Sequence, residues 1–341
     1  MVCIVIVNWN GWGDTIECLE SVFRLEYDDF QVVLCDNDST DRSLEYIKEW
    51  ADGERSCVRA GNVLQDLTSP PVPKPIRYSE YAYNDMERLA DATNENAPLV
   101  LIRTGENRGF AGGNNVGLRY AMKRRDMEFV WLLNNDTVVH KDALKSMVRE
   151  MRRNPSAGIC GSKIISYHDL DKVQSLGGCR FNKWLGISGH IGAKTAASSA
   201  VDKPAVLRQM AYVTGASMLV TQQFLNDVGL MDERYFLYYE EIDWVIRANS
   251  RYSLEFAPDS VVYHKEGAST GTTRSYYADF YSIQSRILFT RKHFPYALPT
   301  VYLGLVCAIF NRIRRNQWDR VALILRMAAG FSRDRPTNSS R

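Results

Sequence analysis

Four short apolar runs constrain the fold of this 341-residue chain more than any other feature. They occupy residues 2–7 (VCIVIV), 31–35 (QVVLC), 99–102 (LVLI) and 129–133 (FVWLL). Each run is short and almost continuously apolar, which is typical of a strand buried on both faces of a sheet. Segments with helical spacing lie between them, so the order of elements predicts an α/β fold with a mostly parallel central sheet flanked by helices.

Two segments around these runs carry further signals. In residues 11–26, Asp14 and Glu17 stand three residues apart ahead of an apolar stripe, which predicts a capping box. Residues 53–98 break the pattern, because the prolines of TSPPVPKPIRYSEY cannot lie inside a sheet. We therefore expect an excursion from the sheet over 53–98, with a short helix near residues 85–90.

Polar clusters follow the four runs. Asn8 follows the first run, Asp36 and Asn37 follow the second, residues 107–115 follow the third, and residues 134–136 follow the fourth. Any one cluster could simply start a turn or cap a helix. Because the carboxyl ends of parallel strands meet at one edge of a sheet, four such clusters together predict a ligand site there.

The loop NRGFAGGNN, residues 107–115, is rich in glycine and amides. It does not fit the G-x-G-x-x-G fingerprint of dinucleotide-binding proteins, and it lacks the lysine of a phosphate-binding Walker loop. Its main-chain N–H groups could still approach a phosphate. Alternatively, its glycines let a helix pack closely on the sheet.

Acidic residues gather after the aromatic stretch YFLYY, at Glu240, Glu241 and Asp243. Carboxyl groups among apolar rings tend to have raised pKa values, which suits a general base. A solvated helix start, where acids favour the helix dipole, is the alternative. His264 follows another apolar run, and together with Asp136 it predicts a cation site at the same edge.

Charge and cysteine usage narrow the class of protein. A net charge of +2 gives no reason to expect nucleic-acid binding. The seven cysteines are scattered and lack zinc-ligand spacing, and Cys3 and Cys35 lie within apolar runs. This pattern favours reduced thiols in the cytoplasm. The first residues show no basic region before an apolar one, so we expect no signal peptide.

Seven stretches together resemble a known family: IVIVNWNG, CDNDSTDRS, NRGFAGGNNVGL, LLNNDTVV, VTGASMLV, GLMDERYFLYYEEIDW and VVYHKEGAST. They are similar to successive motifs of family 2 glycosyltransferases, especially the bacterial rhamnosyltransferase-like branch. The resemblance implies a GT-A fold over residues 1–272. Residues 1–139 would be a Rossmann-like half that binds a nucleotide sugar, with the excursion at 53–98, and residues 140–272 would be the acceptor-binding and catalytic half. Residues 273–341 would form a helical, basic C-terminal extension.

The resemblance also implies residue roles. Glu241 matches the catalytic base, with Glu240 and Asp243 as rivals. Asn134–Asp136 stands where many members have Asp-x-Asp, so Asp136, His264 and Asn134 are expected to hold Mg²⁺ or Mn²⁺, and the neutral amide of Asn134 should weaken that site. The donor is expected to contact Asn8, Asp36, Asn37, Ser39, Asn107, Arg108, Gly109, Gly113, Asn114, Asn134 and Asn135. The acceptor is expected to contact Gly215, Ala216 and Trp244.

The implied activity is inverting transfer of a sugar, with rhamnose as the first guess, from a nucleoside-diphosphate sugar to a saccharide or lipid-linked saccharide in surface polysaccharide synthesis. Two alternatives stay open: a non-catalytic module that binds sugar nucleotides or glycans, and a nicotinamide-dependent oxidoreductase. The second is disfavoured by the missing glycine fingerprint. The first would have no use for a base at Glu241.

The C-terminal region carries an apolar stretch, residues 296–310, followed by arginines at 312, 314, 315 and 320. About 15 residues are too few to span a bilayer. Apolar faces beside arginines suit an interfacial helix, so we expect peripheral membrane contact through these helices at the inner face of the plasma membrane. The alternative is that the helices close the back of the catalytic domain.

Overall fold

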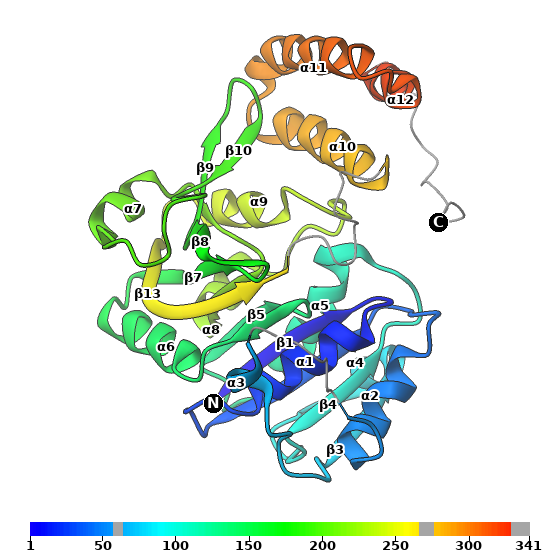
Figure 1. The fold of residues 1–341 in the computed structure, drawn as a ribbon, viewed down its shortest axis with the longest axis vertical. Coiled ribbons are helices and arrows are strands. Elements are labelled where there is room, and N and C mark those ends of the chain that lie inside the picture. The colour runs from blue at the N-terminus through cyan, green and yellow to red at the C-terminus, as the bar shows by residue number, and fades with distance from the viewer. Residues whose placement is uncertain (57–63, 266–275, 329–341) are drawn as a thin grey trace.

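The computed structural model describes residues 1–56, 64–265 and 276–328 (Figure 1). Parts of the predicted C-terminal extension, 273–275 and 329–341, lie outside the described residues. The strands are β1 (Val2–Asn8), β2 (Phe30–Asp36), β3 (Tyr78–Ala82), β4 (Leu99–Arg103), β5 (Phe129–Asn134), β6 (Thr137–Val139), β7 (Ala157–Ser166), β8 (Asp169–Leu176), β9 (Gly178–Asn182), β10 (Ile187–His190), β11 (Tyr212–Val213), β12 (Ser217–Thr221) and β13 (Ser253–His264). The helices are α1 (Trp12–Val22), α2 (Ser43–Asp52), α3 (Gln65–Thr68), α4 (Tyr83–Arg88), α5 (Gly109–Met122), α6 (Ala143–Arg153), α7 (Lys203–Gln209), α8 (Gln222–Val228), α9 (Glu240–Arg247), α10 (Tyr276–His293), α11 (Leu298–Ile313) and α12 (Trp318–Ala328), with a 3-10 turn, η1 (Pro295–Ala297).

One large sheet organises the fold, and it confirms the predicted α/β class. Its strand order is β3-β4-β2-β1-β5-β12-β7-β13-β6, with β8 paired to β7. The strands from β3 to β5 are all parallel. Beyond β5 the sheet becomes mixed, because β12 runs antiparallel to both of its neighbours. The polar ends of β1, β2, β4 and β5 therefore meet at one edge, as predicted.

Apolar layers cover both faces of this sheet. Alternate residues of β1 point to opposite sides, so Ile4 and Ile6 join one core while Cys3 and Val5 join the other. Helices α1, α2 and α6 cover the first face, and α5, α8 and α9 cover the second. Helix α5 approaches β1 very closely, since a Cβ added at Gly117 would lie 2.3 Å from Cγ1 of Val5.

One local expectation is wrong. Helix α1 begins at Trp12 after Gly11 and has no side-chain cap, and Asp14 lies inside its first turn, where it forms an ion pair with Lys265. The segment 53–98 returns to the sheet only at its edge, where β3 pairs in parallel with β4, and α4 lies close to the short helix expected near residues 85–90. The prolines end before Tyr78, so this edge strand escapes the restriction that they impose.

The polar region between β7 and β12 contains a second sheet. Strands β9, β10 and β11 form a separate three-stranded antiparallel sheet. This small sheet and helix α10 stand beside the carboxyl edge of the large sheet (Figure 1). The C-terminal helices α10, α11 and α12 stack on one another at the far end of the molecule (Figure 1).

Among the described residues, one helical segment, Pro295–Ile313, is long and apolar enough by length and composition to cross a membrane. It has 19 residues, because η1 begins one residue before the predicted stretch and α11 ends three residues after Phe310. The length argument from sequence therefore counted too few residues, and the exposure of this helix is the more informative property.

Candidate active site

A cavity of about 890 Å³ lies where the carboxyl edge of the large sheet meets the small sheet, the aromatic segment before α9, and α10. This volume lies near the upper end of the range that is usual for small-molecule sites. The predicted site residues that line it are Asn37, Asn107, Gly109, Asn114, Asn134, Asn135, Asp136, Gly215, Ala216, Glu240, Glu241 and His264. They come from six separate parts of the chain, so the fold brings together what the sequence keeps apart.

Behind the cavity wall, three predicted donor residues bond to one another. Nδ2 of Asn8 donates to Oδ1 of Asp36 over 2.9 Å and to Oγ of Ser39 over 3.0 Å. The hydroxyl of Ser39 also donates to Oδ1 of Asp36 over 2.6 Å. These residues do not line the cavity. Asn8 and Ser39 hold the Asp36 carboxylate in place at the end of β2.

The loop before α5 is tied to the end of β2 and to the aromatic segment. Nδ2 of Asn37 donates to Oδ1 of Asn107 and to the carbonyl of Gly109, each over 3.1 Å. Gly109 has φ +68°, and a Cβ there would lie 2.1 Å from the carbonyl oxygen of Phe236. Only glycine fits this position, because both the backbone conformation and the contact exclude a side chain.

Three predicted contacts do not face the cavity. The guanidinium of Arg108 lies over Tyr83 and pairs with Glu106. A Cβ at Gly113 would lie 2.8 Å from Val7, so this glycine lets α5 pack on β1. Trp244 is fully buried and donates to the carbonyl of Gly229, 2.7 Å away. All three thus have contacts within the protein and none lines the cavity, so the donor contacts expected of Arg108 and Gly113 and the acceptor contact expected of Trp244 stay predictions.

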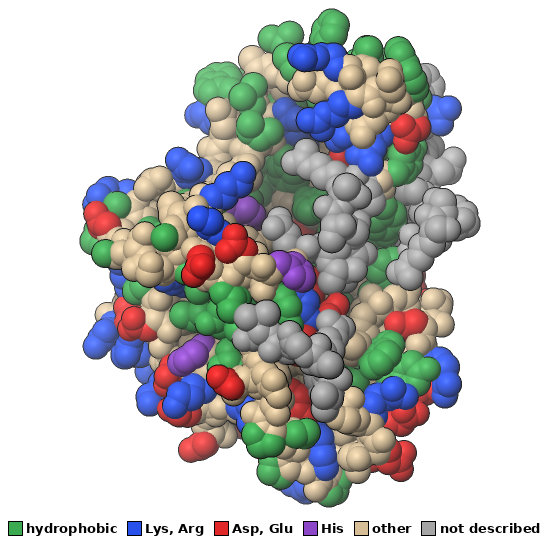
Figure 2. All heavy atoms as spheres, in the orientation of Figure 1, with side chains coloured by type: hydrophobic (Ala, Val, Ile, Leu, Met, Phe, Trp, Pro, Cys, Tyr) green, Lys and Arg blue, Asp and Glu red, His purple; other side chains and the backbone are tan. Residues whose placement is uncertain are grey.

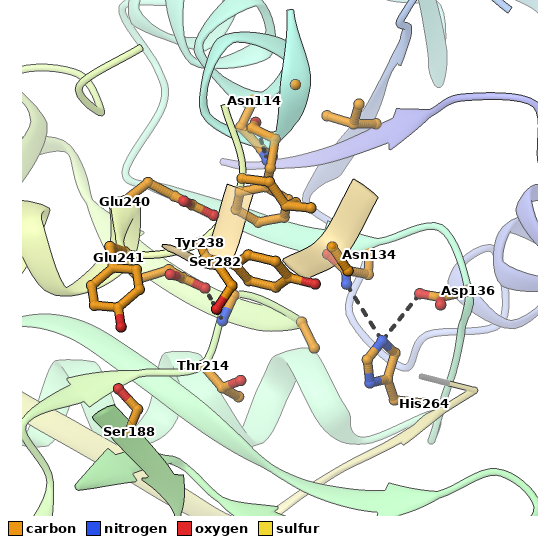
Figure 3. A pocket seen from close by; sticks show the side chains of 18 of the residues that line it. Asn114, Asn134, Asp136, Ser188, Thr214, Tyr238, Glu240, Glu241, His264 and Ser282 are labelled. Atoms are coloured by element: carbon orange, nitrogen blue, oxygen red, sulfur yellow. Dashed lines mark hydrogen bonds and ion pairs between the residues drawn. The ribbon is translucent and has the colours of Figure 1, made fainter. Parts of the chain in front are cut away.

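Asp136 and His264 meet at one side of the cavity (Figure 3). Nε2 of His264 lies 3.1 Å from Oδ1 of Asp136, and Nδ2 of Asn134 lies 3.4 Å from the same nitrogen. Burial opposes ionisation of Asp136, but the charge and hydrogen bond of His264 hold the pKa of its carboxyl below the ordinary value. This carboxylate is therefore ionised at neutral pH.

The donor set at this corner fits a divalent cation in part. Nδ1 of His264 lies 3.1 Å from Oε1 of Gln174, an arrangement that directs Nε2 of the same ring toward Asp136 and Asn134. Its separation from Oδ1 of Asp136 resembles that of adjacent ligands around an octahedral ion, and a half-turn of the Asn134 amide would add an oxygen. The described residues contain no group of three or more His, Cys, Asp or Glu side chains with metal-site geometry. Among the described residues, Asp136 is therefore the one anionic ligand at this corner, and a cation would need oxygens from its substrate.

Glu240 and Glu241 begin α9 on the other side of the cavity (Figure 3). Oε1 of Glu241 accepts a hydrogen bond of 3.2 Å from the main-chain N–H of Gly215. Burial raises the pKa of Glu241 to about 7, which brings it into the range of a general base. Burial, and then the neighbouring charge of Glu241, raises the pKa of Glu240 well above its ordinary value.

The third acid of this group has a different environment. Asp243 is fully buried, and its carboxylate contacts Lys292 over 2.6 Å, His293 over 2.7 Å and Arg247 over 2.9 Å. Burial opposes ionisation, but hydrogen bonds from these three residues lower the pKa of Asp243 overall. Asp243 does not line the cavity. It joins α9 to α10, and this removes it as a rival base.

Sequence reasoning missed one wall of the cavity. Ser188 and His190 from β10, Tyr212 from β11 and Thr214 all line it. Their stretch reads as polar and irregular, so its pairing into a small sheet had no local signal. Lys265 was also missed, although it directly follows His264 and its Nζ contacts Asp14 over 2.6 Å.

The fold and the cavity together define a protein of the GT-A class. The chain belongs to glycosyl transferase family 2, because the model of that family matches residues 3–62 and 84–195, half of the sequence. This confirms the family resemblance read from the motifs.

Two relatives are similar over part of the chain. The low-salt glycan biosynthesis hexosyltransferase Agl10 of Haloferax volcanii is 25% identical over 152 residues, which cover 44% of this chain and 46% of that protein. The dTDP-rhamnosyl transferase RfbF of Shigella flexneri is 26% identical over 184 residues, covering 53% and 55%. The chain therefore spans about half the length of the curated relatives it matches.

Solved structures agree on the fold. The mannosyltransferase PcManGT of Pyrobaculum calidifontis, in complex with GDP-Man and Mn²⁺, has a TM-score of 0.51 and 16% identity, covering 97% of this chain and 86% of that one. GalNAc-T7, with UDP, GalNAc and Mn²⁺, has a TM-score of 0.54 and 13% identity, covering 85% and 47%. At such identities the likeness extends to the fold alone.

Proposed function

We propose that the protein is an inverting glycosyltransferase that moves a hexose-type sugar from a nucleoside-diphosphate sugar to a saccharide or lipid-linked saccharide acceptor. One observation carries this proposal. A carboxyl group with a raised pKa, that of Glu241, faces the same cavity as the ionised Asp136 and His264 (Figure 3). Displacement of a diphosphate requires a base for the attacking hydroxyl and a site for a cation that neutralises the leaving group.

The chemistry would be a single displacement. Glu241 accepts the proton of the acceptor hydroxyl as that oxygen attacks the anomeric carbon. The bond from that carbon to the diphosphate oxygen breaks, and the nucleoside diphosphate departs on the opposite face, so the configuration inverts. A divalent cation held by Asp136 and His264, with Asn134, would neutralise charge on the diphosphate. The hydrogen bond from Gly215 aims the carboxyl of Glu241 and keeps its proton-accepting oxygen in place.

The donor would lie along the edge formed by the ends of β1, β2 and β5. Asn37, Asn107 and Asn114 offer amide groups there. Asp36, which Asn8 and Ser39 hold in place, would fix the position of the nucleoside through the loop that follows β2. The name of the Shigella relative supports dTDP-rhamnose as the first donor to test.

The acceptor would enter from the side of the small sheet. Ser188, His190 and Thr214 supply hydroxyl and imidazole groups suited to sugar hydroxyls, close to Gly215 and Ala216. A cytoplasmic location is proposed, since the six described cysteines are all free and five of them are buried.

A donor screen tests this function. Thermal shift against a panel of nucleotide sugars, with and without Mn²⁺, should raise the melting temperature for one donor by mass action. Release of nucleoside diphosphate from that donor should then follow. Binding without turnover on any acceptor would favour the non-catalytic module, and stabilisation by nicotinamide dinucleotides alone would favour the oxidoreductase.

A further inference from the structure

Helix α11 exposes an apolar stripe that the described residues do not cover. Pro299, Leu303, Val306 and Phe310 recur at helical spacing and are all exposed, with Leu303 at 64% and Phe310 at 63%. The opposite face of the same helix buries Val301 and Leu305, and Leu305 packs with Ile287 of α10 and Ile324 of α12. A helix that is apolar all round is normally covered on all sides.

The tip of the β9–β10 hairpin extends this surface. Trp184, 50% exposed, packs edge-on against Tyr296 at a ring distance of 5.5 Å. The hydroxyl of Thr300 donates to the carbonyl of Trp184 over 2.5 Å, which fixes the hairpin to the start of α11. The docking surface, as we name it, consists of Trp184, Leu185, Ile187, Tyr296, Pro299, Leu303, Val306, Phe310, Arg314 and Arg315.

Basic side chains border this surface. Between residues 298 and 328 the chain has five arginines and one acid, Asp319. Arg312 and Arg320 are engaged by Asp279, but Arg314 and Arg315 are exposed. Figure 2 shows hydrophobic and basic side chains together over these helices, at the top of the view.

We propose that this surface docks peripherally on an anionic lipid bilayer. The apolar stripe would enter the boundary between headgroups and acyl chains, where tryptophan and tyrosine side chains are favoured. Arg314 and Arg315 would lie against lipid phosphates. The packed inner face of α11 opposes insertion across the bilayer, because spanning would separate Leu305 from Ile287 and Ile324.

Charge favours lipid over a second copy of the chain as the partner. A two-fold dimer through this stripe is self-complementary, so it would bring the arginines of both copies to one interface. Like charges placed together oppose association, whereas anionic headgroups compensate them.

The docking surface also adjoins the cavity. Ile187 belongs to both, and Asp279 lines the cavity while it holds Arg312 over 2.9 Å and Arg320 over 2.8 Å. A lipid-anchored acceptor could therefore reach Glu241 without leaving the membrane. That last step rests on the proposed function, whereas the docking itself does not.

Vesicle flotation of the full chain tests the docking without any sugar donor. The chain should float with vesicles of phosphatidylcholine and phosphatidylglycerol at low salt, less at high salt, and little with phosphatidylcholine alone. Leu303→Gln combined with Phe310→Gln should weaken partitioning by roughly tenfold or more. Met122→Gln, at an exposed apolar residue of α5, is the matched control and should float like the native chain.

A charge pair completes the design. Arg314→Gln with Arg315→Gln should weaken binding to anionic vesicles by roughly tenfold. Arg88→Gln with Arg125→Gln, at two arginines whose side chains are 81% and 84% exposed, should not. If the native chain fails to float with anionic vesicles at low salt, the proposal is overturned. A dimer that the Leu303/Phe310 variant dissociates, without vesicle binding, would overturn it in favour of a subunit contact.

Discussion

The main-chain N–H of Gly215 donates to Oε1 of Glu241 over 3.2 Å, and a Cβ at Gly215 would lie 2.5 Å from that same oxygen. The turn before β12 thus sets where the base of α9 can point. A hydrogen bond holds the carboxyl in place, and the missing side chain leaves room for it. This contact joins two segments that lie 26 residues apart in the sequence.

Gly215→Ala should therefore lower kcat by displacing the carboxyl of Glu241. The expected loss is on the order of tenfold to a hundredfold, as for a misplaced catalytic group. Donor affinity, measured by calorimetry, should stay within a few-fold of the native value. Gly189→Ala is the control, since a Cβ there meets nothing within 4 Å. Equal loss in both variants would mean that space near Glu241 is not the cause.

The pH dependence of kcat/KM should report the raised pKa of Glu241. The base must be ionised to accept a proton, so activity should rise as pH passes through about 7 and then level off. Glu241→Gln should remove this limb from whatever activity remains. A native profile already flat from pH 5 upward would contradict the assignment, because a carboxyl with its ordinary pKa of 4.5 would be ionised throughout.

Stability should change with pH in the opposite direction to activity. The unfolded chain releases the Glu241 proton near pH 4.5 and the folded chain only near pH 7. Between these values the folded state binds more protons, so rising pH removes stability. Glu241→Gln should be more stable than the native chain at pH 8, by on the order of 2 kcal/mol, with little difference at pH 4. Denaturant titrations at both pH values measure this difference.

The number of carboxylates at the predicted cation site, formed by Asp136, His264 and Asn134, should set its affinity for Mn²⁺. Asp136→Asn removes the one carboxylate that the described residues place at this corner, and it should abolish the dependence of nucleotide-diphosphate binding on Mn²⁺. Asn134→Asp adds a second carboxylate and should tighten Mn²⁺ binding, since oxygen-ligand charge sets affinity for hard cations. Asp85→Asn, at an exposed residue of α4, controls for charge. Calorimetric titration with Mn²⁺ and the nucleotide measures all three, and unchanged affinity in Asp136→Asn would contradict the assignment.

The sequence predicted the fold and the convergence of polar residues well, for a physical reason. Buried parallel strands leave continuous apolar runs, and their polar ends must share an edge, so Asn37, Asn134 and Asp136 could be placed together in advance. The small antiparallel sheet had no such signal, because its strands have only two to five residues and β10 is mostly exposed, and Ser188 and His190 were missed with it. The buried position of Trp244 also could not be read locally, since it depends on contacts with Gly229 and Phe224.

The most direct test of the account compares Glu241→Gln with Glu240→Gln in transfer from the identified donor. Removing a general base should cost on the order of a hundredfold or more in kcat while donor affinity is retained. The account predicts this loss in Glu241→Gln, a clearly smaller one in Glu240→Gln, and inverted anomeric configuration in the product by NMR. A near-native rate in Glu241→Gln, with transfer abolished in Glu240→Gln, would contradict it.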